Sequence, residues 1–72
     1  MTPWGTRRTL TARGRQNARV TIVVQVYRLK VLVTVIDVPF VAESILDPGQ
    51  ADSLGDMLVH AASEARDGTK GA

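Results

Sequence analysis

The sequence contains no cysteine, only three aromatic residues and a single histidine among its 72 residues. Without cysteine, neither a disulfide nor a thiolate metal site can stabilise the chain. A folded chain of 7.8 kDa exposes about 4,400 Å² against about 11,300 Å² when unfolded, so folding hides roughly 60% of its surface. Such a core is marginal for one small domain, and self-association is the other common source of stability.

The first half of the chain also lacks acidic residues. Residues 1–36 carry seven basic side chains, whereas residues 37–72 carry seven acidic and two basic ones. The two halves therefore have formal charges of +7 and −5, which give the net charge of +2. This split suits either contacts between copies of the chain or a basic surface that faces a polyanion. A solvated surface without a partner is the third interpretation.

No apolar run is long enough to predict a transmembrane helix. The longest, residues 20–36, is interrupted by one glutamine and two basic residues, and 11 of its 17 residues are Val, Ile or Thr. It predicts two buried strands instead. Arg7 and Arg8 are followed by three further arginines rather than by the apolar segment of an export signal. We therefore expect a soluble, cytoplasmic protein that has no membrane partner.

Alternation of side chains predicts a small antiparallel sheet of three to four strands, arranged as a meander. The expected strands are residues 6–13, 20–27, 31–38 and 40–46, within a sheet region of residues 7–46 that follows an irregular N-terminal arm of residues 1–6. A turn is expected at residues 14–17, because Gly14 and Asn17 tolerate positive φ. The link at residues 28–30 has no Gly, Asn or Pro. Both a tight hairpin and one long bent strand therefore stay open there.

The sequence Asp47-Pro48-Gly49-Gln50 predicts the start of a C-terminal helix. An N-cap acid, a proline in the first turn and a glutamine at the third position form a variant of the capping box. Apolar residues follow at helical spacing, namely Ala51, Leu54, Leu58, Ala61, Ala62 and Ala65. We expect a helix over residues 48–67, packed on one face of the sheet, and a flexible tail over residues 68–72. The chain is then a single α+β domain.

Both faces of the central strands are largely apolar, which predicts a homo-oligomer. One helix can cover only one face of a small sheet, so the other face needs a partner. The alternation does not decide which face meets the helix. The residues that we take as candidates for self-association form one alternating set: Val20, Ile22, Val24, Val26, Val31, Val33 and Val35.

Few side chains could carry catalysis. Asp56, His60 and Glu64 follow one another at four-residue spacing, which places them on one face of the expected helix. A metal site normally needs three or four converging ligands, so a solvated helix face is the favoured interpretation. No glycine-rich phosphate loop is present either. We expect no enzyme activity, no catalytic residue, no metal, no cofactor and no small-molecule substrate.

The basic N-terminal segment is the candidate site for a macromolecular partner, through Trp4, Arg7, Arg8, Arg13, Arg15 and Arg19. Guanidinium groups along a hairpin suit phosphate. No helix-turn-helix, basic helix or pair of aromatic residues on a strand is evident, however. Trp4 would be the anchor of an arm that docks on a neighbouring subunit, and a mobile arm is the alternative. The leading hypothesis is therefore a non-enzymatic protein-binding homo-oligomer, with nucleic acid as the alternative partner.

Residues 39–54, which contain Leu46-Asp47-Pro48-Gly49-Gln50-Ala51-Asp52-Ser53-Leu54, and the later Ala61-Ala62-Ser63-Glu64-Ala65-Arg66 carry a resemblance. They resemble the C-terminal half of small uncharacterised proteins from actinobacteria and their phages. Seven arginines against two lysines suit the high-GC coding of such genomes. No activity is attached to this resemblance. It implies a compact phage or actinobacterial accessory protein, and we expect its partner to be a host or virion protein, met in the host cytoplasm if a phage encodes the chain.

Overall fold

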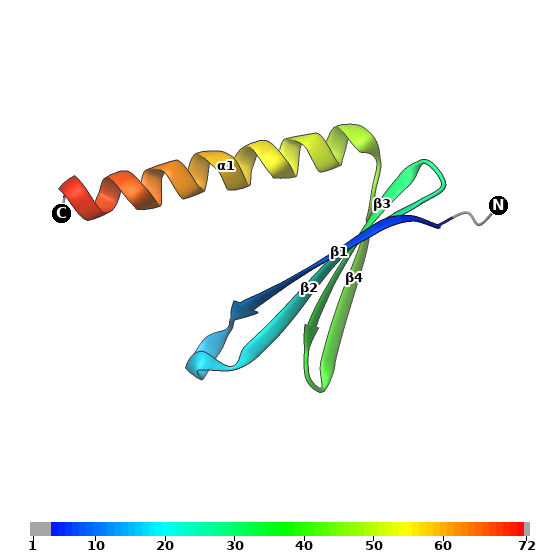
Figure 1. Cartoon of the computed structure of the whole chain (residues 1–72), viewed down its shortest axis with the longest axis horizontal. Coiled ribbons are helices and arrows are strands. Elements are labelled where there is room, and N and C mark those ends of the chain that lie inside the picture. Colours follow the sequence, from blue (N-terminus) through cyan, green and yellow to red (C-terminus); the bar gives the residue numbers. More distant parts are fainter. Residues whose placement is uncertain (1–3, 72) are drawn as a thin grey trace.

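The computed structural model describes the backbone of residues 4–71 and the side chains of residues 4–68. Its elements follow in the order β1 (Trp4–Arg13), the short 3-10 helix η1 (Arg15–Asn17), β2 (Arg19–Tyr27), β3 (Lys30–Asp37), β4 (Phe40–Leu46) and α1 (Pro48–Gly71). The strands form one antiparallel sheet in the order β1-β2-β3-β4. The predicted α+β fold, a meander followed by one C-terminal helix, is confirmed (Figure 1).

The strand register assigns each residue of the sheet to one of two faces, because neighbours along a strand alternate and cross-strand partners point the same way. The inner face, on the side of α1, consists of Arg8, Leu10, Ala12, Val20, Ile22, Val24, Val26, Val31, Val33, Val35, Asp37, Phe40, Ala42, Ser44 and Leu46. The outer face consists of Trp4, Arg7, Thr9, Thr11, Arg13, Arg19, Thr21, Val23, Gln25, Tyr27, Lys30, Leu32, Thr34, Ile36, Val41, Glu43 and Ile45. The inner face is mostly apolar, with Arg8 and Asp37 as its charged groups, whereas the outer face mixes apolar, polar, basic and acidic groups.

Two turns use left-handed backbone at residues other than glycine. The β2–β3 hairpin closes through two residues with Arg28 at φ 56°, so a tight hairpin forms here and not one long bent strand. In η1 the left-handed residues are Gln16 and Asn17, at φ 57° and 62°. The prediction that Gly14 supplies a positive φ is wrong, because its φ is −97°. Glycine is needed here because Val20 packs closely against its backbone. A Cβ at Gly14 would lie 2.7 Å from Cγ2 of Val20.

Strand β1 begins earlier than the alternation predicts. Trp4 pairs with Tyr27, and the register shifts by a bulge before Arg7. Trp4, Gly5 and Thr6 are therefore part of the strand and not of an irregular arm, while the first three residues of that predicted arm lie outside the described residues. A bulge hides the strand because the extra residue breaks the alternation of side chains.

Helix α1 begins with the predicted capping box. The N–H of Asp47 donates to Oε1 of Gln50 at 3.1 Å, and the N–H of Gln50 donates to Oδ1 of Asp47 at 2.8 Å. The helix continues to Gly71, beyond the predicted end at Asp67. Gly68 does not end it, because no described glycine has the left-handed backbone of a helix stop. Over the described residues no helix combines the length and apolar character needed to cross a membrane.

The described chain has almost no core of its own. Val20 and Val23 are its only buried apolar residues. After its first turns α1 diverges from the sheet, and its main contacts are with β3 and β4 (Figure 1). The radius of gyration is 14.6 Å, against about 11 Å for a compact chain of this length. The predicted packing of the helix on one face is therefore confined to the start of the helix.

Candidate functional site

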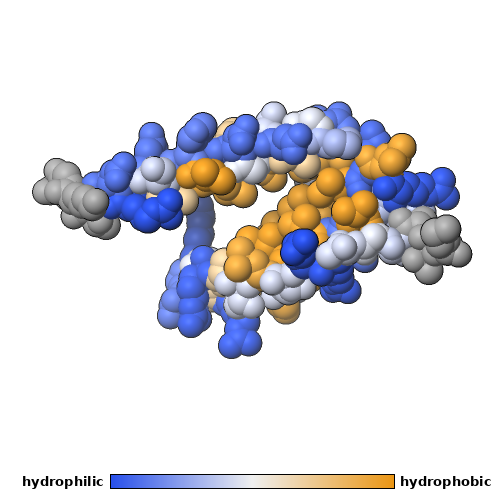
Figure 2. All heavy atoms as spheres, turned by 45° about the horizontal axis from the view of Figure 1, so that its top comes forward, coloured by the Kyte–Doolittle hydropathy of each residue, from blue (hydrophilic) through white to orange (hydrophobic). Residues whose placement is uncertain are grey.

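The inner face and α1 enclose an open apolar groove of about 180 Å³. It is lined by Val24, Val31, Val33 and Leu46 of the sheet and by Ala51, Leu54, Gly55 and Leu58 of the helix. Figure 2 shows these two apolar surfaces facing each other across open space. Leu58 is 62% exposed, and so is Leu10 farther along the inner face. The groove thus has the composition of a protein core without its packing.

All of the residues predicted for self-association lie on this inner face: Val20, Ile22, Val24, Val26, Val31, Val33 and Val35. The sequence led us to expect the helix on one face and the open apolar surface on the other. Both lie instead on the same side of the sheet, because α1 leaves the sheet at an angle after Asp47 (Figure 1). Val24 and Val26 consequently stay exposed beneath it.

The predicted basic residues do not form one site. Arg7, Arg13 and Arg19 lie on the outer face, whereas Arg8 lies on the inner face and Arg15 lies in η1. Arg13 and Arg19 are direct cross-strand partners. Like charges in this arrangement repel each other. Three of the five arginines therefore share one surface, two of them are paired across β1 and β2, and Nη1 of Arg13 donates to the carbonyl of Asn17 at 3.4 Å.

The outer face also carries an aromatic pair that the sequence analysis missed. The ring centroids of Trp4 and Tyr27 lie 4.4 Å apart with an interplanar angle of 53°, and the Arg28 guanidinium lies 5.6 Å from the centre of the Tyr27 ring. Trp4 contacts Tyr27 of its own chain, and its docking on a neighbouring subunit stays a prediction. Extending the first predicted strand to Trp4 by regular alternation would have placed Trp4 opposite Arg28 and on the other face, so the ring pair depends on the bulge before Arg7.

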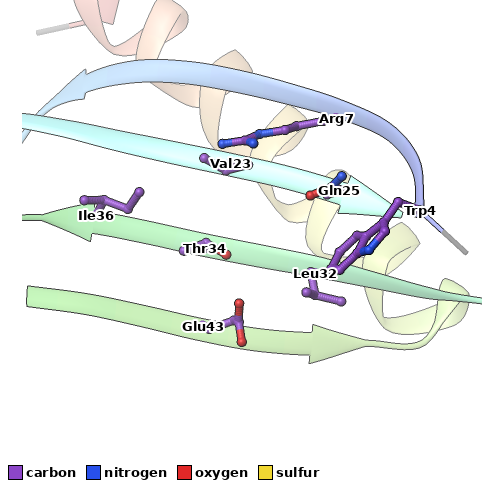
Figure 3. A pocket seen from close by; sticks show the side chains of 8 residues that line it. All are labelled: Trp4, Arg7, Val23, Gln25, Leu32, Thr34, Ile36 and Glu43. Carbon is purple, nitrogen blue, oxygen red and sulfur yellow. The ribbon is translucent and has the colours of Figure 1, made fainter. Parts of the chain in front are cut away.

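A hollow of about 160 Å³ lies beside the aromatic pair. Its lining comes from all four strands and consists of Trp4, Arg7, Val23, Gln25, Leu32, Thr34, Ile36 and Glu43. In Figure 3 the Trp4 indole lies near Gln25 and Leu32 at one end of the hollow, and Glu43 stands on β4. Hydrogen-bond donors and acceptors thus surround an aromatic ring on an open surface.

The helix residues considered for metal or acid–base chemistry are exposed. Asp56, His60 and Glu64 follow one another along α1, one turn apart. Within residues 4–68, no three side chains of the metal-binding types come together closely enough to hold an ion. The arrangement is that of a polar helix surface.

Comparison with known proteins identifies no relative. The chain matches no protein-family model, no curated protein and no solved structure. The resemblance to actinobacterial and phage proteins stays a prediction, and the function has to be inferred from the two faces of the sheet and from the groove.

Proposed function

We propose that the protein is a non-enzymatic interaction protein whose working form is a homodimer joined through the groove. The observation that carries this proposal is the accessible surface of the single chain, 6190 Å². A compact protein of this mass exposes about 4,400 Å², so each chain has an excess of about 1,800 Å². Two chains that hide this excess would bury about 3,600 Å², which is typical of obligate dimers.

The second copy is the occupant that suits the groove best. A groove with an apolar sheet on one side and an apolar helix stripe on the other is self-complementary, so a two-fold axis lets each helix cover the inner face of its partner. With 24 residues, α1 is about 36 Å long, whereas its four-stranded sheet is only about 14 Å wide. The helix is therefore longer than its own sheet is wide, and in the dimer it would reach the sheet of the partner. The acidic C-terminal half and the basic N-terminal half of the chain add electrostatic attraction.

In such a dimer the outer faces stay open to a further partner. The sequence-based hypothesis of a host or virion protein as a partner of the dimer, in an actinobacterial or phage setting, belongs to this proposal, which does not assign the outer face to that protein. Its non-enzymatic character is supported by the exposure of Asp56, His60 and Glu64, which line neither the groove nor the hollow of the outer face.

Two matched substitutions on α1 test the dimer. Leu58→Glu places a charge in the groove, and Ser63→Glu places the same charge on the polar side of the helix. We expect the wild type and Ser63→Glu to sediment at twice 7.8 kDa, and Leu58→Glu to dissociate or unfold. In the isolated chain Leu58 is mostly exposed, so a monomeric protein would tolerate both changes equally. Equal masses and equal stabilities of the two variants would contradict the proposal.

A further inference from the structure

We propose that the outer face of the sheet binds single-stranded nucleic acid, DNA or RNA, with Trp4 and Tyr27 stacking on a base and Arg7, Arg13 and Arg19 holding phosphates. This surface lies on the side of the sheet opposite to the groove, so it is available in a monomer and in the proposed dimer alike. The inference therefore stands or falls independently of the dimer.

The charge of the outer face favours a polyanion. Arg7, Arg13, Arg19 and Lys30 are exposed there, and Glu43 is the only acidic group that the register places among them. The basic groups lie on β1, on β2 and at the start of β3, whereas Glu43 lies on β4. A phosphate backbone is therefore attracted to the β1–β2 half of the face and is kept away from β4.

The Arg13–Arg19 pair points to an anion in particular. The two residues are directly opposite each other at the end of the β1–β2 hairpin, where their repulsion costs stability in the free protein. A phosphate between the two guanidinium groups converts this repulsion into two charge-assisted hydrogen bonds. The free protein thus carries two paired arginines at this end of the face, where Nη1 of Arg13 also donates to the carbonyl of Asn17 at 3.4 Å.

The aromatic pair favours nucleic acid over other polyanions as the ligand of this face. Trp4 is 47% exposed although its ring centroid lies 4.4 Å from that of Tyr27. Part of the indole is therefore accessible to a base. Gln25 and Thr34 line the hollow beside it and supply polar groups for base edges (Figure 3). An acidic peptide has no aromatic base that could stack on Trp4, and the paired bases of a duplex are stacked on one another already.

The dimensions fit a short single strand. The aromatic pair and the Arg13–Arg19 pair lie at opposite ends of β2, which runs from Arg19 to Tyr27. Eight residue steps along a strand span about 26 Å. This length corresponds to the shorter sites known for single strands, of about four nucleotides. Arg7 lies between the two ends, where a phosphate of the same strand would pass.

The test uses the full chain, whose only tryptophan is Trp4. Oligothymidylate and oligouridylate of about eight nucleotides are titrated against its intrinsic fluorescence, beside a duplex of equal length, heparin and polyglutamate. We expect quenching by both single strands and weaker binding of the duplex. With three to four phosphate contacts, affinity should fall about 20- to 50-fold between about 50 and 200 mM salt.

Four variants, followed by the anisotropy of a labelled oligonucleotide, locate the site. Trp4→Ala should weaken binding about 5- to 150-fold, and Trp4→Phe should restore a large part of the loss because an aromatic ring is retained. Arg7→Ala should lower the salt slope by about 0.7. The matched variant Arg8→Ala removes the same charge from the inner face and should leave the slope unchanged.

The proposal is overturned if the single strands do not bind at low salt, or if the duplex binds more tightly. It is also overturned if heparin or polyglutamate binds as tightly and Trp4→Ala has no effect, a result that would assign the face to an acidic protein partner. Sedimentation of the same samples shows whether the dimer is present, so a failure of the dimer proposal is seen separately.

Discussion

The two faces of the sheet are built from the same strands but differ in the unfavourable features that they expose, which are apolar surface on one face and paired like charges on the other. The inner face presents valine, isoleucine and leucine to an open groove, and its exposed apolar surface requires burial. The outer face carries like charges in direct opposition together with a partly exposed aromatic pair, the groups that we propose as a ligand site. One face is therefore suited to assembly and the other to binding.

This difference teaches that a small chain can use one face of its sheet for assembly and the other face for binding. A sheet without a second layer cannot bury both of its faces. Because the helix and most of the apolar surface lie on the same side, the other side holds a mixed surface around the buried Val23. The outer face can then hold unfavourable pairs such as Arg13 and Arg19, at a cost in stability that the proposed ligand would offset.

The largest effect is expected from a charge on the inner face. Ile22→Asp places a carboxylate in the middle of the apolar surface, and it should destabilise the protein by about 3 kcal/mol or more, because an unpaired charge would be buried in the dimer. Thr21→Asp puts the same group on the outer face, one residue away, and should cost about 1 kcal/mol or less. Thermal unfolding followed by circular dichroism measures both. A loss of stability at Thr21 that equals the loss at Ile22 would end the distinction between the faces.

A smaller effect is expected from the close contact that supports the inner face. A Cβ at Gly14 would lie 2.7 Å from Val20, which is one of the buried residues. Gly14→Ala should therefore cost about 1–3 kcal/mol through overpacking. Gly68→Ala, which has no atom within 4 Å of the new Cβ, is the control and should stabilise the protein by up to about 1 kcal/mol, because alanine favours the helix. Chemical denaturation compares the two, and equal midpoints would show that Val20 is not held in place.

The start of α1 determines how the helix stands over the inner face. Asp47→Ala removes one half of the capping box and should destabilise the protein by about 1 kcal/mol, whereas Asp47→Asn, which retains an N-cap acceptor, should stay close to the wild type. Urea unfolding of the two variants measures the difference. If alanine were tolerated as well as asparagine, the cap would have no part in placing the helix.

The smallest effect has the opposite sign and concerns the outer face. Arg19→Thr removes the repulsion with Arg13 and should stabilise the protein by about 0.2–1 kcal/mol, while weakening the binding of single strands. Arg15→Thr removes a charge from η1, which has no cross-strand arginine, and serves as the control. Unfolding and binding are measured on the same preparations. A variant at Arg19 that lost stability would show that the pair is not strained.

Much of the fold could be predicted because its signals are local. The alternation over β2 and β3 identifies the strands, and Asp47 and Gln50 identify the helix start, since both patterns depend only on neighbouring residues. The bulge that adds Trp4 to β1 interrupts the alternation and hides the strand start. Gly68 is compatible with both a helix and a stop, so its presence alone did not locate the helix end.

The candidate sites were predicted only in part, because they depend on relations across the sheet. The alternating valine set of the inner face follows directly from periodicity. The angle at which α1 leaves the sheet does not, since it is set by the few contacts that follow Asp47 (Figure 1). The pairing of Arg13 with Arg19 and of Trp4 with Tyr27 requires the register, which the turn lengths and the bulge determine.

The most direct test of the central claim is the thermal unfolding of the wild type over a wide range of protein concentration, together with its mass in solution. If the inner face is completed by a second copy, the melting temperature must rise with concentration and the native mass must be twice 7.8 kDa. A melting temperature independent of concentration, with the mass of a single chain, would contradict the account.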